Sequence, residues 1–250
     1  MSMLTKRCCS TNTQFPLRMY GCESMMHSIA SYVGSPKILD FAYTRGIPDN
    51  EVGASQVHDI QTTDHNPISI EVYGLIVVSW NIEGMCTRSK RETAVKENIK
   101  HLQSLFDKPV IFLFQEIFLQ DEVNDENAED RMKRLLPDYT FITDGYTGCI
   151  AIPPVVKHSN VRYIDRPDKK GKKCTVVTVT YNDKTFNLAN IHLKSIVLYP
   201  ITGKSLQRKE MQNILANTPN NTLYMGDFNT GSPEKLLGGK RTKRRRMKRK

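Results

Sequence analysis

The chain has 250 residues, of which 39% are hydrophobic and 25% charged, so it suits one large soluble domain and excludes a disordered chain. No apolar run approaches the ~20 residues that cross a bilayer, which excludes a membrane span. The formal net charge is +10, but the last eleven residues hold nine lysines and arginines and no acid, so the rest carries +1. The basic character therefore belongs to a tail.

The six cysteines form no CxxC pair and no zinc-site spacing. The first residues lack the apolar core of a secretory signal peptide. We therefore expect reduced thiols in a protein of the nucleus or the cytoplasm, and we do not expect secretion. We also expect a monomer, with association with a virion as an alternative localisation.

In chain order, the first elements are a short helix at 23–33, a strand at 38–43 and a loop at 44–56. Two strands at 68–72 and 75–80 follow, joined through Tyr73-Gly74 as a hairpin. Val95, Ile99, Leu102 and Phe106 recur at helical spacing and predict a helix over 90–107.

An unbroken apolar run predicts a strand at 109–114, followed by a helix over 124–136 that ends before Pro137. The remaining predicted elements are strands and one helix. The strands lie at 139–143, 148–154, 174–181, 186–193 and 221–229, and the helix at 205–217. Many strands with few amphipathic helices predict an α/β (α+β) fold, with two packed, mainly antiparallel sheets flanked by helices.

The hairpin brings polar residues together. If Val72 faces Leu75, paired residue numbers sum to 147, which sets Asn66 opposite Asn81 and Asp64 opposite Glu83. Adjacent strands lie ~5 Å apart, and like charges so close are destabilising unless a cation lies between them. This register indicates a cation near one sheet edge, with His65 one step away. The alternative is that both strand ends fray into solvent and the two acids never approach each other.

Polar, metal-competent residues also follow apolar strands in "IFLFQE", "LANIHLKS" and "LYMGDFN". Singly, each block is also compatible with ordinary strand-end or turn chemistry. Together, the blocks "SWNIEG", "FQE", "GCIAI", "NIHLKS", "GDFN", "ILDFAY" and "TDHNPISI" resemble the endonuclease/exonuclease/phosphatase superfamily. That superfamily includes deoxyribonucleases, apurinic-site endonucleases, tyrosyl-DNA phosphodiesterases, inositol-phosphate phosphatases and sphingomyelinases.

The resemblance implies a four-layered αββα sandwich, but the blocks stand in an altered order. "ILDFAY" and "TDHNPISI" close the domain in the family, whereas here they precede "SWNIEG". We therefore expect a circular permutation, tolerated because domain termini often lie close together. Residues 1–236 would form the domain, with 1–73 supplying the family's C-terminal part and 75–236 its N-terminal part, and 237–250 would be a flexible basic tail. Domain swapping of residues 1–73 is the alternative.

The resemblance also implies hydrolysis of a phosphate ester by water, assisted by Mg²⁺ or, as an alternative, Mn²⁺. The residues that would bind the metal or lie beside it are Glu116, Glu83 and Asp64. Asp227 would orient or deprotonate the attacking water, and His65, oriented by Asp40, would stabilise charge on the phosphate. The remaining predicted site residues contact the phosphate or lie beside it: Asn81, His192 and Asn229.

The tail predicts a polyanionic partner, nucleic acid and in the first place DNA, because clustered cations bind phosphate backbones without sequence preference. Its basic residues are Lys240, Arg241, Lys243, Arg244, Arg245, Arg246, Lys248, Arg249 and Lys250. A nuclear-localisation signal and a merely solubilising tail are the other interpretations. The functions left open are a nuclease or DNA-end-processing hydrolase, a phosphatase or phosphodiesterase for inositol phosphates or lipid head groups, and a non-catalytic nucleic-acid-associated or virion protein.

Overall fold

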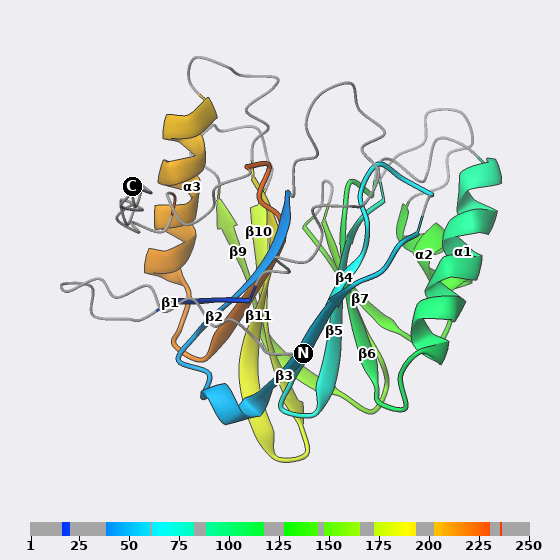
Figure 1. The fold of residues 1–250 in the computed structure, drawn as a ribbon, viewed down its shortest axis with the longest axis horizontal. Helices are drawn as coiled ribbons and strands as arrows, with labels where there is room; N and C mark the ends of the chain where they lie inside the picture. Colours follow the sequence, from blue (N-terminus) through cyan, green and yellow to red (C-terminus); the bar gives the residue numbers. More distant parts are fainter. Residues whose placement is uncertain are drawn as a thin grey trace, which may run out of the picture.

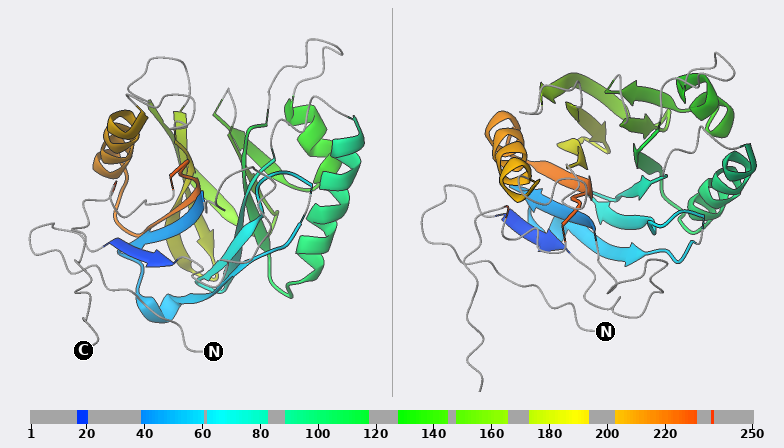
Figure 2. Two further views of the ribbon diagram at one scale, coloured as in Figure 1. Left: turned by 45° about the horizontal axis from the view of Figure 1, so that its top comes forward. Right: turned by 90° about the horizontal axis from the view of Figure 1, so that it is seen from above.

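The computed structural model describes residues 17–20, 39–60, 62–82, 89–117, 128–144, 148–165, 173–193, 203–230 and 236. Within them, two six-stranded sheets lie face to face, with helix α3 (Gly203–Asn217) outside one sheet and helices α1 (Ser89–Ser104) and α2 (Ala128–Leu135) outside the other (Figure 1). Figure 2 shows the same four layers from two further directions. The predicted four-layered sandwich is confirmed.

The first sheet has the order β1-β2-β12-β11-β10-β9. Its strands are β1 (Leu17–Tyr20), β2 (Asp40–Arg45), β12 (Thr222–Asp227), β11 (Lys184–His192), β10 (Lys173–Tyr181) and β9 (Lys157–Asp165). Its neighbours run antiparallel except β11 and β12.

The second sheet has the order β3-β4-β5-β6-β8-β7. Its strands are β3 (Val52–Val57), β4 (Ile68–Val72), β5 (Leu75–Asn81), β6 (Val110–Gln115), β8 (Cys149–Ile152) and β7 (Thr140–Thr143). Only β5 and β6 are parallel in it. The prediction of mainly antiparallel sheets is therefore correct.

Three apolar clusters hold the layers together. One fills the space between the sheets, one joins α1 and α2 to the second sheet, and one joins α3 to the first. β5 and β6 are buried along their whole length, which explains why their sequences are almost continuously apolar rather than alternating.

The β4–β5 hairpin forms as predicted, with Val72 opposite Leu75 and Ile68 opposite Ser79. Tyr73 and Gly74 both have positive φ, 53° and 75°, as a two-residue type I′ turn requires.

The ladder ends at the Ile68–Ser79 pair, so the predicted pairing of Asn66 with Asn81 is wrong. The Asn66 side chain instead accepts a hydrogen bond from the backbone N–H of Ile60 at 3.4 Å. Residues 62–65 form turns and bends rather than strand, and the polar contact with Ile60 replaces strand pairing.

Two further predictions need correction. The sequence predicts a loop at 44–56, but these residues hold the end of β2, a 3₁₀ turn (Asp49–Glu51) and most of β3. The sequence does not predict β9 at all, and nearly all of its residues are exposed. Both β3 and β9 are edge strands. Edge strands bury little, so they need no alternating apolar pattern that a sequence would reveal.

The predicted helix at 23–33, Glu83 and the basic tail lie outside the described residues. Among the residues that are described, no helix has both the length and the apolar character needed to span a membrane.

Candidate active site

Several strands end at one edge of the sandwich, which we call the site rim. The parallel strands β5 and β6 end there with Asn81 paired to Gln115, and β11 and β12 end there with His192 paired to Asp227. β2 begins at the same place, because Asp40 pairs antiparallel with Asp227. The parallel register therefore places residues of both sheets at one edge, although these residues are far apart in the sequence.

Glu116 directly follows β6, and its backbone adopts a left-handed conformation with φ of 56°. A non-glycine residue in this region carries strain of order 1–3 kcal/mol and is often found at functional sites. The Glu116 carboxylate accepts a hydrogen bond from Asn81 Nδ2 at 3.0 Å and lies 3.4 Å from His192 Nε2. Asn81 Nδ2 also donates to Asp227 Oδ2 at 3.2 Å, so one amide links carboxylates carried by the two sheets.

The Glu116 carboxylate is held in its charged form. The hydrogen bond and charge of His192, together with the Asn81 amide and the charge of His65, outweigh the opposing effect of burial and lower the pKa of Glu116 to about 2. The side chain is 31% exposed. Glu116 is therefore a carboxylate at neutral pH that remains accessible from solvent.

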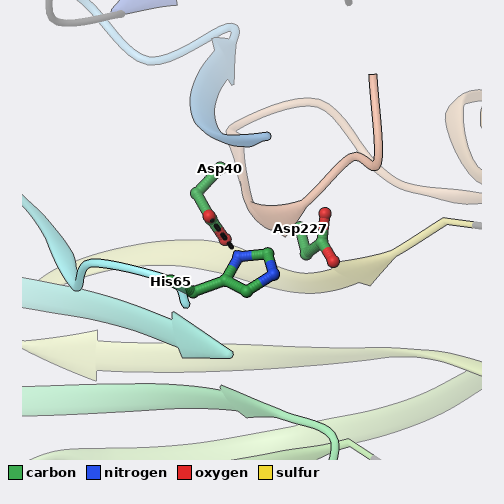
Figure 3. Close-up of side chains that lie close together, drawn as sticks. All are labelled: Asp40, His65 and Asp227. Carbon is green, nitrogen blue, oxygen red and sulfur yellow. Dashed lines mark hydrogen bonds and ion pairs between the residues drawn. The ribbon is translucent and has the colours of Figure 1, made fainter. Parts of the chain in front are cut away.

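His65, which comes from the loop before β4, lies beside the side chains of Asp40 at the start of β2 and Asp227 at the end of β12 (Figure 3). Its Nδ1 is 2.7 Å from Asp40 Oδ2. Burial alone would lower the pKa of His65, but the charge and hydrogen bond of Asp40, with the charges of Asp227 and Asp64, raise it to about 10. The imidazole is therefore a cation at neutral pH, with Nδ1 donating to Asp40.

The loop that carries His65 is anchored to the end of β5. Trp80 Nε1 lies 3.2 Å from Thr63 Oγ1 and donates to the carbonyl oxygen of His65 at 3.1 Å. Thr63 Oγ1 donates to the backbone of the same loop and of Asn81. The sequence predicts neither Thr63 nor Trp80 as a supporting residue; the only signal is their place inside the motif blocks.

Asp227 is almost fully buried at the end of β12. It accepts hydrogen bonds from the backbone N–H and the side-chain amide of Asn229, both at 2.7 Å. Burial, together with the charge of Asp40, raises the pKa of Asp227 against the opposing effects of His192, His65 and Asn229. Asn229 has a positive φ of 49°, and its amide also donates to the carbonyl oxygen of Leu193. Asp227 is thus fixed in orientation and is a stronger base than an ordinary aspartate.

The structure brings Asp40, His65, Asn81, Glu116, His192, Asp227 and Asn229 to the site rim. Asp64 lies at its margin, 38% exposed, with Oδ1 at 3.8 Å from His65 Nε2. Its role towards a metal, and that of Glu83, stay predictions.

The donor atoms fit a divalent cation at the rim. Ligand atoms of Glu116, His192 and Asp227 lie within 4.8 Å of one another, and those of Asp40, His65 and Asp227 form a second such group. In the second group, His65 Nδ1 is already hydrogen-bonded to Asp40 Oδ2 at 2.7 Å, so this nitrogen is committed within the protein. The first group offers an accessible, ionised carboxylate beside a second carboxylate, the oxygen donors that Mg²⁺ and Mn²⁺ prefer.

At the level of sequence, no protein-family model and no curated relative matches this chain. Solved structures do match in fold. A D. rerio TDP2 humanised by 14 mutations has a TM-score of 0.51 at 18% identity over 65% of this chain and 66% of that chain. D. rerio TDP2 complexed with single-strand DNA product has a TM-score of 0.51 at 19% identity over 65% of this chain and 64% of that one.

An endonuclease/exonuclease/phosphatase from Bacteroides vulgatus has a TM-score of 0.48 at 16% identity over 65% of this chain and 69% of that chain. The chain spans just under two thirds of the length of the two TDP2 structures. At these identities the likeness is one of fold. The described residues have the two-sheet sandwich fold of these TDP2 structures.

Proposed function

We propose that this protein is a metal-dependent phosphoric ester hydrolase that uses water, most specifically a nuclease or a DNA-end-processing phosphodiesterase. One observation carries the proposal: the carboxylates of Glu116 and Asp227 and the imidazole of His65 meet at one rim, although they come from distant parts of the chain. Attack of water on a phosphate ester needs these three functions, namely a cation-holding group, a base and a donor to the phosphate oxygens.

Glu116 would hold the cation, with Asp227 and His192 near it. A bound Mg²⁺ or Mn²⁺ supplies charge that offsets the negative charge developing on the phosphate. Asn81 donates to both carboxylates and so fixes their separation. Its role is to keep the two acids aligned from opposite sheets.

Asp227 would orient the attacking water and take its proton. Its raised pKa favours proton transfer at neutral pH, because the best general base has a pKa near the working pH. Two hydrogen bonds from Asn229 hold the carboxylate in one rotamer. The water would therefore meet a base that needs no rearrangement before reaction.

His65 would donate from Nε2 to a nonbridging phosphate oxygen, since its Nδ1 is committed to Asp40. A charged donor stabilises the extra negative charge of the transition state more than that of the substrate. His192 would contribute a further donor at the same rim, whereas Asn229, whose amide donates to Asp227 and to the carbonyl oxygen of Leu193, would hold Asp227 in place.

Two observations favour nucleic acid as the substrate class. Nine cations in the last eleven residues suit a phosphate backbone. TDP2, whose fold is similar, has been solved with a single-strand DNA product.

We also propose that the chain is a circular permutant that acts as a monomer. The strands β2, β3 and β4, which precede β5 in sequence, occupy places in both sheets of the same chain. The two-residue turn at Tyr73-Gly74 joins β4 directly to β5, so it leaves no hinge loop that would let residues 1–73 exchange between molecules. Residues up to 73 would then supply Asp40 and His65, and the residues after the turn would supply the other side chains of the rim.

The test is incubation of the purified protein with labelled single-stranded, double-stranded, abasic and 5′-blocked DNA, with Mg²⁺ or with chelator. Release of phosphate from inositol phosphates is measured in parallel. We expect metal-dependent DNA cleavage that is lost in Glu116→Gln, Asp227→Asn and His65→Ala.

Glu71→Gln is the matched control, because Glu71 is similarly exposed and ion-paired, with Lys108 at 2.7 Å, but lies next to the turn at the other end of β4. Full activity of Glu116→Gln would remove the proposed metal role. Release of phosphate from inositol phosphates without DNA cleavage would show that the substrates are inositol phosphates rather than nucleic acid.

A further inference from the structure

The space between the sheets changes from apolar to polar one layer below the site rim. Deeper in the sandwich this space is filled by side chains such as those of Val77, Leu188 and Leu223. The next layer towards the rim contains Ser79, Gln115 and Asn190, all buried. Polar residues between two sheets are costly unless they are hydrogen-bonded, so such a layer calls for a physical explanation.

The Asn190 amide joins the two sheets. Its Oδ1 accepts a hydrogen bond from Gln115 Nε2 at 2.7 Å. Its Nδ2 donates to the backbone carbonyl oxygens of Phe114 at 2.9 Å and Cys149 at 3.2 Å. Asn190 belongs to β11 in the first sheet, and all three partners belong to the second. Both amide hydrogens and the carbonyl oxygen of this side chain are therefore used across the sheet interface.

These contacts lie at the point where the pairing of β6 with β8 ends. Phe114 and Cys149 form the last pair of the β6–β8 ladder towards the rim. Beyond it, Gln115 continues β6, and the chain then turns at Glu116 with its positive φ. Gly148 leaves room for the amide, because a Cβ there would lie 3.3 Å from Asn190 Nδ2 and 3.0 Å from Asp144 Oδ2.

The amide residues Gln115 and Asn190 lie close in sequence to rim residues, one in each sheet. Gln115 immediately precedes Glu116, and Asn190 lies two residues before His192, on the same face of β11. Glu116 and His192 come from opposite sheets, so their 3.4 Å separation depends on the spacing of the sheets and on the turn after Gln115.

We propose that Asn190, through Gln115, is a positioning residue that sets the distance between Glu116 and the side chains of the other sheet. This inference rests on the proposed function of the rim. Loss of the amide would leave the fold in place but would let Glu116 and His192 move apart. Displacements of about 1 Å in a catalytic group can reduce rates by roughly 100-fold.

The experiment compares Asn190→Leu with Asn187→Leu. Asn187 is a buried asparagine of the same strand that accepts from Thr178 Oγ1 at 2.9 Å and donates to the carbonyl oxygens of Asn220 and Asn221, and it lies towards the opposite end of β11. Both variants lose buried hydrogen bonds, so both should lose stability. Only Asn190→Leu should alter the rim.

Three quantities are measured for each variant: urea stability, kcat and KM on the best DNA substrate, and the Mg²⁺ dissociation constant by calorimetry. For Asn190→Leu we expect kcat to fall by about 10- to 100-fold with little change in KM, and the Mg²⁺ dissociation constant to rise about tenfold. Asn187→Leu should keep kcat and Mg²⁺ affinity within about twofold of the original. Equal kcat losses in the two variants, following their losses of stability, would overturn the proposal.

Crystal structures of the original chain and of Asn190→Leu give a readout that does not depend on activity. We expect the Glu116–His192 separation to increase by about 0.5–1 Å in the variant. An unchanged separation overturns the positioning role even if the protein is a hydrolase, whereas a widened rim in a protein without hydrolase activity would refute only the proposed function. If Asn190→Leu does not fold, Asn190→Ser is used, since a water can then satisfy the two carbonyl oxygens.

Discussion

Gly226, the residue before Asp227, gives the sharpest prediction of stability. Its φ is +149°, and a Cβ atom built there would lie 1.9 Å from the carbonyl oxygen of Ile191. Real Cβ atoms essentially never approach a heavy atom within 3.0 Å, and the obstacle here is backbone of the neighbouring strand β11. In Gly226→Ala, β11 and β12 would have to separate by about 1 Å, which also displaces Asp227 from the rim.

Overpacking and unfavourable φ each cost roughly 1–3 kcal/mol, so Gly226→Ala should lose about 4 kcal/mol of unfolding free energy. With a urea m-value of about 2 kcal/mol/M, the unfolding midpoint falls by about 2 M. Gly74→Ala is the matched control: Gly74 has φ of +75°, but nothing lies within 4 Å of an added Cβ. That variant carries only the cost of the left-handed conformation, about 1 kcal/mol. Equal midpoints for the two variants would refute the reasoning.

Three other predictions follow from charge. Burial, with a contribution from His101, lowers the pKa of His58 in the folded protein to about 4. Below about pH 6.5 the unfolded chain therefore binds more protons than the folded protein. Allowing for solvent screening, the free energy of unfolding should fall by about 2 kcal/mol as the pH is lowered towards 4. Urea unfolding at pH 7.5 and 4.5 should show a smaller loss in His58→Gln than in the original chain, and equal losses would contradict this. In Asp40→Asn, the pKa of His65 falls, so less of the imidazole is protonated at pH 8 than at pH 6. We therefore expect kcat to drop roughly tenfold or more at pH 8 and less at pH 6. Parallel pH–rate profiles for the variant and the original chain would contradict the proposed role of Asp40 in keeping His65 protonated. Deleting residues 240–250 should weaken DNA binding and reduce the slope of log K against log salt by about 0.9 for each phosphate that the tail neutralises, with hydrolysis of a small phosphodiester unchanged; an unchanged slope would show that the tail does not anchor DNA.

The sequence allows the site rim to be anticipated because its residues sit at the ends of strongly apolar strands. β5 and β6 are buried throughout, so the polar residues Asn81 and Glu116 mark where each strand leaves the core. Tyr73-Gly74 likewise predicts the hairpin register, because a two-residue turn with positive φ permits few alternatives. Local chemistry decides these features, and local chemistry is visible in a sequence.

Features that depend on packing between distant segments are not predictable in this way. β9 has no apolar pattern because it is an exposed edge strand. The hairpin ladder ends at Ile68 and Ser79, and Asn66 instead accepts a hydrogen bond from Ile60, a contact that no periodicity signals. Asn190 looks like one polar residue in an apolar strand, and only the arrangement of the sheets shows that its amide contacts Gln115.

The most direct test of the account is a crystal structure of the protein soaked with Mn²⁺, whose anomalous scattering locates the ion. The account predicts a peak within coordination distance of the Glu116 carboxylate, on the side facing Asp227, and its loss in Glu116→Gln. A peak held by Asp40 and His65 instead, or a peak that persists at the rim in Glu116→Gln, would contradict the claim that the two sheets together build a cation-binding hydrolytic site.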